Sequence, residues 1–290
     1  MKFKYKHAII AALGLTFTAL IFPTLNQKTD GFFNTAFSAV SSSFGSYSGL
    51  SSHSASTPSS GRYSTNVTFS PTAPQNFTEA KQVAKQIYSD HRYTFYCGCK
   101  FDKHGKVDLH SCGYKIQNDA RRARRLEWEH IVPVSRMASH LPCWKNKLCS
   151  KERGGSYGGR NCCREIDPAF VKMEADLHNL VPEIGELNAC RSNFRFGMLP
   201  FVKPGQFGEC SIKIDKETRR VEPDVQVRGM IARVYLYIEQ TYHLRLSDSQ
   251  LQLFRAWNKL YPPEPWEIER DRRIYLIQGN HNPFVLGLNQ

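Results

Sequence analysis

The sequence is poor in acidic residues and lacks several motifs that mark common enzyme classes. Its 26 Asp and Glu residues are outnumbered by 39 Lys and Arg residues, which gives a formal net charge of +13. No H-E-x-x-H sequence occurs, which argues against a zincin-type metalloprotease. P-loop and G-x-G-x-x-G sequences are also absent, so we expect neither a P-loop NTPase nor a Rossmann dinucleotide-binding protein. A basic excess of this size is typical of proteins that bind a polyanion such as nucleic acid, although a merely basic and soluble surface would give the same count.

The N-terminus has the pattern of an export signal. Lys2, Lys4 and Lys6 form a basic start, and residues 8–25 follow with few polar residues and no charge. We therefore predict a signal peptide over residues 1–26. An uncleaved membrane anchor is the alternative, because the apolar run is long for a signal and short for a membrane span. No second apolar run is long enough to cross a bilayer, so we expect the rest of the chain to be secreted or periplasmic.

Nine cysteines fit an oxidising compartment, in which clustered cysteines usually form disulfides. Zinc is disfavoured because the pair Cys97 and Cys99 has one spacer residue and the pair Cys162 and Cys163 has none, whereas structural zinc sites commonly have two. The odd number leaves one thiol free or paired with another chain. The nine are Cys97, Cys99, Cys112, Cys143, Cys149, Cys162, Cys163, Cys190 and Cys210.

The chain divides into a low-complexity segment and one domain. Residues 27–76 are rich in Ser, Thr, Gly and Pro and carry few charges, so we predict a disordered linker that cannot bury enough apolar surface to fold. Residues 77–290 are expected to form one α+β domain with more helix than strand. Thr78 and Ser247 are expected to cap helices. The residue patterns predict helices over 77–90, 168–180, 185–191, 225–241 and 247–260, a strand over 126–134 and a loop over 139–164.

The first cluster that could carry chemistry runs from Arg124 to His130 and includes Glu127 and Glu129. Phosphodiester hydrolysis needs a base, for which a neutral imidazole near pH 7 is suitable. It also needs a divalent ion to neutralise charge on the phosphate, and a guanidinium group to hold it. On a strand the two carboxylates share one face and His130 points to the other, although at a strand end Glu129 and His130 could flank one site. An ordinary strand with exposed charges and a satisfied histidine would have the same residues.

Three further positions offer weaker signals. Glu174 and His178 would lie one turn apart on a helix, as a metal-binding pair or as a simple ion pair. Asn188 offers a neutral oxygen that suits Mg²⁺, but Asn is also a common turn residue. Arg160 follows two glycines in a basic segment that could be a mobile phosphate-binding loop or a solvated turn.

Several motifs together resemble the bacterial endonuclease I family, whose members are periplasmic or secreted nucleases. The resemblance covers residues 77–285. The motifs, which occur in this order, are Phe95-Tyr96-Cys97-Gly98-Cys99, Ser111-Cys112-Gly113-Tyr114, Glu127-Trp128-Glu129-His130-Ile131-Val132-Pro133, Met173-Glu174-Ala175-Asp176-Leu177-His178-Asn179-Leu180, Ala256-Trp257-Asn258-Lys259 and Ile277-Gln278-Gly279-Asn280-His281-Asn282-Pro283-Phe284.

The resemblance implies a ββα-metal (His-Me finger) active site in a mainly helical α+β domain that disulfides stabilise. It assigns His130 as the general base, and Glu129 and Asn188 as ligands of a single Mg²⁺ ion, for which Mn²⁺ or Ca²⁺ can substitute. Arg160 would steady the phosphate and Glu174 would support the site. The implied activity is sequence-nonspecific cleavage of DNA and RNA by a monomer, which leaves 5′-phosphate and 3′-hydroxyl ends. A catalytically inactive, basic DNA-binding or adhesive surface protein is the alternative.

The chain departs from the family pattern at its cysteines and around Arg160. Ile268 replaces one usual cysteine, the usual C-terminal cysteine is absent, and the G-G-R-N-C segment is one residue short. Cys149 and Cys163, which look additional, flank an enlarged loop over residues 148–160. We hypothesise that a disulfide between Cys149 and Cys163 ties this loop down, and that reduced protein is poorly active.

Overall fold

The structure is a computed structural model that describes residues 68–288. The predicted signal peptide over residues 1–26 lies outside the described residues, as does the predicted linker up to residue 67. The helices are α1 Phe77–Ile87, α2 Ala120–Ala123, α3 Val134–Ala138, α4 Pro142–Lys145, α5 Arg160–Ile166, α6 Pro168–Glu174, α7 Gly185–Arg191, α8 Val225–Tyr242, α9 Asp248–Leu260 and α10 Pro265–Gln278, with 3-10 turns η1 Leu109–Cys112 and η2 Leu177–Asn179. The strands are β1 Lys100–Phe101, β2 Val107–Asp108, β3 Leu126–His130, β4 Cys149–Ser150, β5 Ser156–Tyr157, β6 Leu180–Ile184, β7 Arg195–Phe196, β8 Lys213–Asp215 and β9 Arg220–Glu222. The predicted α+β fold with more helix than strand is confirmed, and the strands form small sheets of two or three.

The antiparallel pair β3 and β6 carries the predicted site residues. Leu126 lies opposite Ile184, and His130 lies opposite Leu180. The chain passes directly from β6 into α7, and Gly185 permits this because a Cβ there would collide with the backbone of α2 at Arg122. The helix over 185–191 is confirmed, whereas the predicted strand ends at His130, four residues early.

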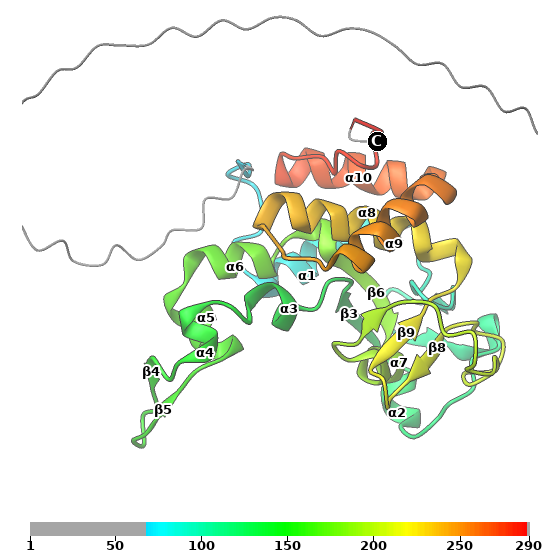
Figure 1. Ribbon diagram of the computed structural model, residues 1–290, viewed down its shortest axis with the longest axis horizontal. Coiled ribbons are helices and arrows are strands. Elements are labelled where there is room, and N and C mark those ends of the chain that lie inside the picture. The colour runs from blue at the N-terminus through cyan, green and yellow to red at the C-terminus, as the bar shows by residue number, and fades with distance from the viewer. Residues whose placement is uncertain (1–67, 289–290) are drawn as a thin grey trace, which may run out of the picture. The chain divides into compact units, whose positions relative to one another are not determined.

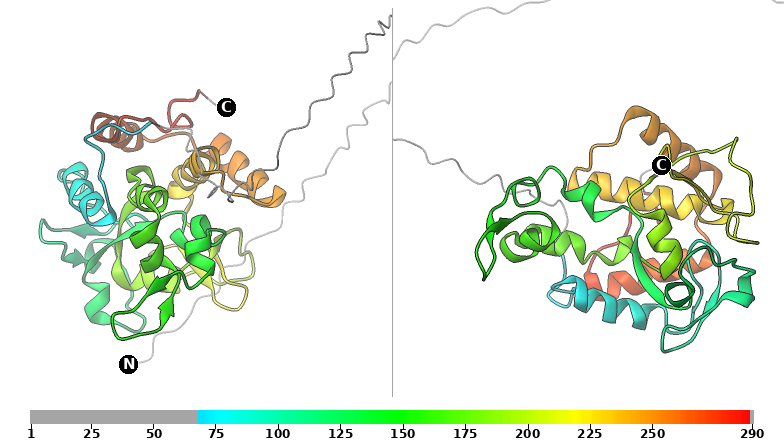
Figure 2. Two further views of the ribbon diagram at one scale, coloured as in Figure 1. Left: turned by 90° about the vertical axis from the view of Figure 1, so that its left-hand side faces the viewer. Right: turned by 90° about the horizontal axis from the view of Figure 1, so that it is seen from below.

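The longest helices cover one side of the strand pair. Figure 1 shows α8, α9 and α10 stacked together above β3 and β6, and Figure 2 shows α1 beside α10. Trp128 of β3 and Leu180 of β6 pack with Ile274 of α10 in one apolar cluster. The predicted helices over 77–90, 225–241 and 247–260 are confirmed as α1, α8 and α9. Ser247 caps α9 as predicted, but Asn76, not Thr78, caps α1.

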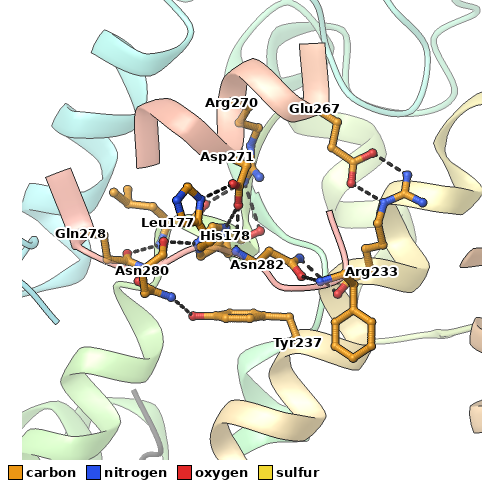
Figure 3. A network of polar contacts seen from close by, with 12 residues as sticks. Leu177, His178, Arg233, Tyr237, Glu267, Arg270, Asp271, Gln278, Asn280 and Asn282 are labelled. Atoms are coloured by element: carbon orange, nitrogen blue, oxygen red, sulfur yellow. Dashed lines mark hydrogen bonds and ion pairs between the residues drawn. The ribbon is translucent and has the colours of Figure 1, made fainter. Parts of the chain in front are cut away.

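A buried polar network holds η2 between α8 and α10 (Figure 3). Nη2 of Arg270 donates to three backbone carbonyls, those of Leu177, His178 and Leu180. The imidazole of His178 contacts the carbonyl oxygen of Asn280 at 3.0 Å. Because α6 ends at Glu174 and the chain then turns, Glu174 and His178 do not share a helix face, and the metal-binding pair suggested by their spacing is wrong.

Four disulfides form within residues 68–288, and Cys190 is the free thiol among the nine cysteines. The preference for disulfides over zinc is confirmed. The hypothesised Cys149–Cys163 bond is wrong, because Cys149 pairs with Cys162 and Cys163 pairs with Cys143. The other two bonds are Cys97–Cys210 and Cys99–Cys112.

The segment predicted as a loop over residues 139–164 is largely ordered. It contains α4, the β4–β5 hairpin and the first turn of α5, and the hairpin extends away from the long helices in Figures 1 and 2. The Cys149–Cys162 bond ties the hairpin to α5, and the Cys143–Cys163 bond ties α4 to the same helix. Among the described helices, none has the length and apolar content to cross a bilayer.

Replacing Cys149 and Cys162 together by Ser should lower the free energy of unfolding by about 3 kcal/mol, because their bond closes a short loop in the unfolded chain. Urea unfolding of the oxidised protein would measure the loss. Cys190→Ser is the matched control, and it should leave stability unchanged and abolish thiol titration of the denatured chain. A second titratable thiol in oxidised wild type, or equal stability of the double variant, would contradict the pairing.

Candidate active site

The predicted site residues on β3 leave the strand on opposite faces. Glu127 and Glu129 face α7, where their side chains meet Asn188 and Arg191. His130 faces the other way and stacks on Phe77 of α1, with ring centroids 4.9 Å apart. The alternation expected for a strand therefore persists to the last residue of β3, and Glu129 and His130 do not share a face.

Glu129 is held in a buried ion pair. Its carboxylate accepts from Nη1 of Arg191 at 2.9 Å and from the Tyr96 hydroxyl at 3.3 Å. Burial raises the pKa of Glu129 to about 7, and the charge of Arg191 offsets part of that rise. Both of these contacts use Oε1, so Oε2 is the oxygen that a metal ion would bind.

Asn188 is oriented by a neighbouring carboxylate. Its Nδ2 donates to Oε2 of Glu127 at 3.1 Å, which leaves Oδ1 as the ligand atom that the amide offers. Carboxylate and amide oxygens are the donors that hard divalent cations prefer, so Glu129 and Asn188 fit Mg²⁺ chemically. Both oxygens of Glu127 on the same face are already bound by Arg122, and Oε1 is also bound by Arg125. A metal ion would compete with Arg191 for Glu129, because the guanidinium group of Arg191 already balances the charge of this carboxylate.

His130 is positioned to act as a base. It is 8% exposed, and its Nε2 lies 2.9 Å from the backbone carbonyl oxygen of Glu174. Because a carbonyl only accepts, Nε2 must carry the hydrogen, and the lone pair of the neutral ring is on Nδ1. Burial lowers the pKa of His130 to about 4, so the ring is neutral at pH 7.

Two guanidinium groups converge on Glu174 beside His130. Arg160 and Arg164 both form ion pairs with its carboxylate, and Arg164 Nε lies 2.7 Å from Oε2. Burial alone would raise the pKa of Glu174, but the two arginines outweigh it and lower the pKa. Both guanidinium carbons also lie over the ring of Phe77, at 5.3 and 5.8 Å from its centroid. Nη2 of Arg160 is buried and has no hydrogen-bond partner among the described residues, so it is a donor available to a phosphate oxygen.

The backbone before α5 requires glycine in order to place Arg160. Gly159 has φ +85°, a conformation that side chains disfavour, and a Cβ on Gly158 would collide with the carbonyl oxygen of Asn146. The helix that follows carries Arg160, Arg164 and the disulfide-bonded Cys162 and Cys163. Arg160 is therefore fixed by a covalently tied helix and is not on a mobile loop.

A second buried carboxylate lies on the strand next to β3. Glu183 of β6 accepts from the backbone N–H groups of Tyr96 and Ile184, each at 2.7 Å. Burial raises the pKa of Glu183 to about 8, although these N–H groups favour the charged form and lower it in part. Tyr96 thus connects Glu183 to Glu129 through its backbone and its hydroxyl.

The structure brings the five predicted residues together in two groups. His130, Arg160 and Glu174 form one group, and Glu129 and Asn188 lie on the other face of β3. Sequence reasoning missed several residues that complete these groups. Arg164 could have been found from its spacing of four from Arg160, had a helix been predicted there, whereas no sequence signal pointed to Phe77 or to Arg191.

The sequence model of the endonuclease I family matches residues 50–287, which is more than half of the chain. The chain belongs to the endonuclease I family.

Individual relatives agree with this membership in the endonuclease I family. An extracellular deoxyribonuclease of Aeromonas hydrophila is 45% identical over 219 residues, which are 74% of this chain and 91% of that protein. An Endonuclease-1 of Buchnera aphidicola subsp. Baizongia pistaciae is 44% identical over 216 residues, 73% of this chain and 83% of that protein. A periplasmic deoxyribonuclease of Aeromonas hydrophila is 44% identical over 216 residues, 73% of this chain and 85% of that protein. The resemblance described above and the secreted or periplasmic location are confirmed.

Replacing Glu183 by Gln should stabilise this endonuclease I domain at pH 8.5 but not at pH 4. The folded pKa, about 8, lies above the ordinary value of 4.5, so the contribution of wild-type Glu183 to stability is full below about pH 4.5 and is lost as the pH rises through 8. Each unit of pKa difference corresponds to about 1.4 kcal/mol. Urea unfolding at both pH values would measure the difference, with exposed Glu152→Gln as the control. Parallel pH dependence of wild type and Glu183→Gln would contradict it.

Proposed function

We propose that the chain is an exported, metal-dependent, sugar-nonspecific endonuclease that hydrolyses phosphodiester bonds. The observation that carries the proposal is the contact between Nε2 of His130 and the Glu174 carbonyl, which leaves Nδ1 unprotonated beside two guanidinium groups. A neutral base next to phosphate-binding cations is the arrangement that this reaction requires. The names of the relatives support DNA as a substrate, since two of them are deoxyribonucleases.

His130 acts as the general base. Its Nδ1 takes a proton from the water molecule whose oxygen attacks phosphorus. The bond from phosphorus to the 3′-oxygen then breaks, and that oxygen takes a proton from solvent, which gives a 3′-hydroxyl and a 5′-phosphate. The carbonyl of Glu174 holds the His130 ring during proton transfer and bond cleavage. The apolar face of Phe77 packs against the ring and favours its neutral form.

Glu129 and Asn188 hold the metal ion, with Oε2 and Oδ1 as the binding atoms. When bound, a Mg²⁺ ion, or Mn²⁺ or Ca²⁺ in its place, neutralises charge on the phosphate. Glu129 and His130 are consecutive, so their Cα atoms are about 3.8 Å apart. We infer that a phosphodiester bound across the end of β3 contacts both faces, and that β3, β6 and α7 serve as the ββα-metal core.

Arg160 binds the phosphate, and Glu174 is a positioning residue. The free Nη2 of Arg160 donates to a phosphate oxygen, while Glu174 keeps the planar group aligned through its carboxylate. Such contacts recognise the charge of the phosphate and not the base sequence, so DNA and RNA are both substrates. Binding therefore weakens as the salt concentration increases. We further propose that the nuclease acts as a monomer, that residues 77–290 form its catalytic domain and that residues 1–26 direct export.

His130→Ala should lower the rate of DNA and RNA cleavage by about 10²–10⁴-fold, because the variant lacks its base. Plasmid DNA and RNA would be incubated with oxidised protein in Mg²⁺ and in EDTA, and products would be followed on gels. Wild type should degrade both substrates in Mg²⁺ and neither in EDTA. Exposed His104→Ala is the matched control and should cleave like wild type. Intact substrate in every condition, with folded and disulfide-bonded wild type, would contradict the proposal and favour a nucleic-acid-binding protein without activity.

Reduction should inactivate the protein by about 10²-fold, because small displacements of a positioning group have effects of this size. The disulfides to Cys162 and Cys163 hold the helix that carries Arg160. Cleavage would be timed with and without dithiothreitol, and Cys190→Ser would show whether the free thiol contributes. Unchanged activity in a chain whose four disulfides are demonstrably reduced would refute the dependence.

A further inference from the structure

A large basic cavity lies apart from the predicted site residues. Its volume is about 1060 Å³, at the upper end of the range for ligand-binding pockets. It is lined by residues of α3, by residues around the end of α8 and the start of α9, and by residues near β7 and β9. None of the five predicted site residues lines it, and neither Asp nor Glu occurs among its lining residues within 68–288. Its five arginines are Arg136, Arg195, Arg219, Arg220 and Arg245.

None of these arginines forms an ion pair within the described residues, although the charge of Arg220 contributes to lowering the pKa of Asp215, its partner across β8 and β9. In the described part of the chain, the ion pairs involve other arginines, such as those bound to Glu127, Glu174 and Glu222. Arg136 is half-buried, and burial together with the guanidinium groups of Arg195, Arg191 and Arg219 lowers its pKa. Like charges gathered around a partly buried guanidinium destabilise the folded chain, and a bound anion would remove that repulsion.

The cavity is also built to hold these groups in place. Nη2 of Arg219 donates to Oδ1 of Asn193 at 2.7 Å, which directs this guanidinium along the cavity wall. Arg219 has a φ angle of 54° in the turn between β8 and β9, and His243, with φ 56°, is the left-handed residue that ends α8. The buried hydroxyl of Tyr235, which also lines the cavity, lies beside the guanidinium group of Arg191. Five guanidinium groups thus surround one cavity with no carboxylate among its lining residues in the described part of the chain, which suits an anionic ligand.

The cavity connects with the candidate active site through one residue. α3, which carries Arg136, begins four residues after His130. Arg191 lies close enough to Arg136 to affect its pKa, and the same guanidinium pairs with Glu129. The cavity and the candidate active site therefore share one buried guanidinium group.

We propose that this cavity is a second phosphate-binding site, which holds the backbone of a nucleic acid away from the bond that is cleaved. The assignment of nucleic acid rests on the proposed function, whereas the anion chemistry rests on the arginines alone. Planar guanidinium groups bind phosphate oxygens in pairs, and a set of them on one wall suits successive phosphates of a strand. A strand that binds here, away from the bond that is cleaved, is held more tightly by the protein without any contact to its bases.

The test measures binding without turnover. Oxidised full-length protein would be titrated into a short fluorescein-labelled DNA duplex in EDTA, and anisotropy would be recorded at several NaCl concentrations. The double variant Arg136→Gln/Arg195→Gln should bind the duplex at least about tenfold more weakly than wild type. The slope of log K against log salt concentration should also be less negative by about 2. The control Arg153→Gln/Arg255→Gln removes the same charge from exposed positions outside the cavity and should bind like wild type.

The outcomes separate this site from the nuclease activity. Equal weakening in both double variants would overturn the proposal, because net charge alone would then explain the binding. Calorimetric titration with inorganic phosphate provides a second arm, and loss of phosphate binding in Arg136→Gln/Arg195→Gln without loss of DNA binding would assign the cavity to a free anion and overturn the nucleic-acid assignment. Selective loss of DNA binding supports the site even if wild type proves unable to cut DNA, since no step of the measurement requires cleavage.

Discussion

The guanidinium group of Arg191 is the buried charge on which the end of β3 depends. It is 1% exposed, donates to the carbonyl oxygens of His130 and Ile131, and pairs with Glu129. Removing one partner of a buried ion pair typically costs about 3–5 kcal/mol, because the other charge remains without compensation. One side chain therefore determines both the position of the Glu129 carboxylate and the path of the backbone from which the imidazole of His130 extends. The stability of the strand end and the arrangement of the site cannot be separated.

The division of β3 into two faces gives the two halves of the chemistry different surroundings. The His130 face is buried against Phe77 and lies near Arg160 and Arg164, so the imidazole stays neutral although the Glu174 carbonyl favours its charged form. The Glu129 face is rich in carboxylates balanced by arginine, so it suits a cation. Alternation along one strand separates the two environments by one residue.

How far the sequence could predict the structure depended on the kind of signal. The helices over residues 225–242 and 248–260 have clear apolar stripes, so both were predictable. β6 was not, because all five of its residues are buried and the alternation that identifies a half-exposed strand is absent. The contact between His130 and Glu174 was not predictable from residue types either, since it uses a backbone carbonyl that any residue supplies. The identities of His130, Glu129 and Asn188 came from family resemblance, and the pairing of Cys162 and Cys163 could not be deduced from spacing alone.

The adjacency of Cys162 and Cys163 has a consequence for how the protein matures. Their native bonds span 20 and 13 residues, and exchanging the two partners would close loops of almost the same lengths. Chain entropy varies only with the logarithm of loop length, so it does not discriminate between the native isomer and the exchanged one. Only the packing of the hairpin against its helix selects the native isomer. Production in a compartment that oxidises thiols without rearranging disulfides should therefore yield a mixture of the native and exchanged isomers. A host that produces the native protein must also supply a disulfide isomerase.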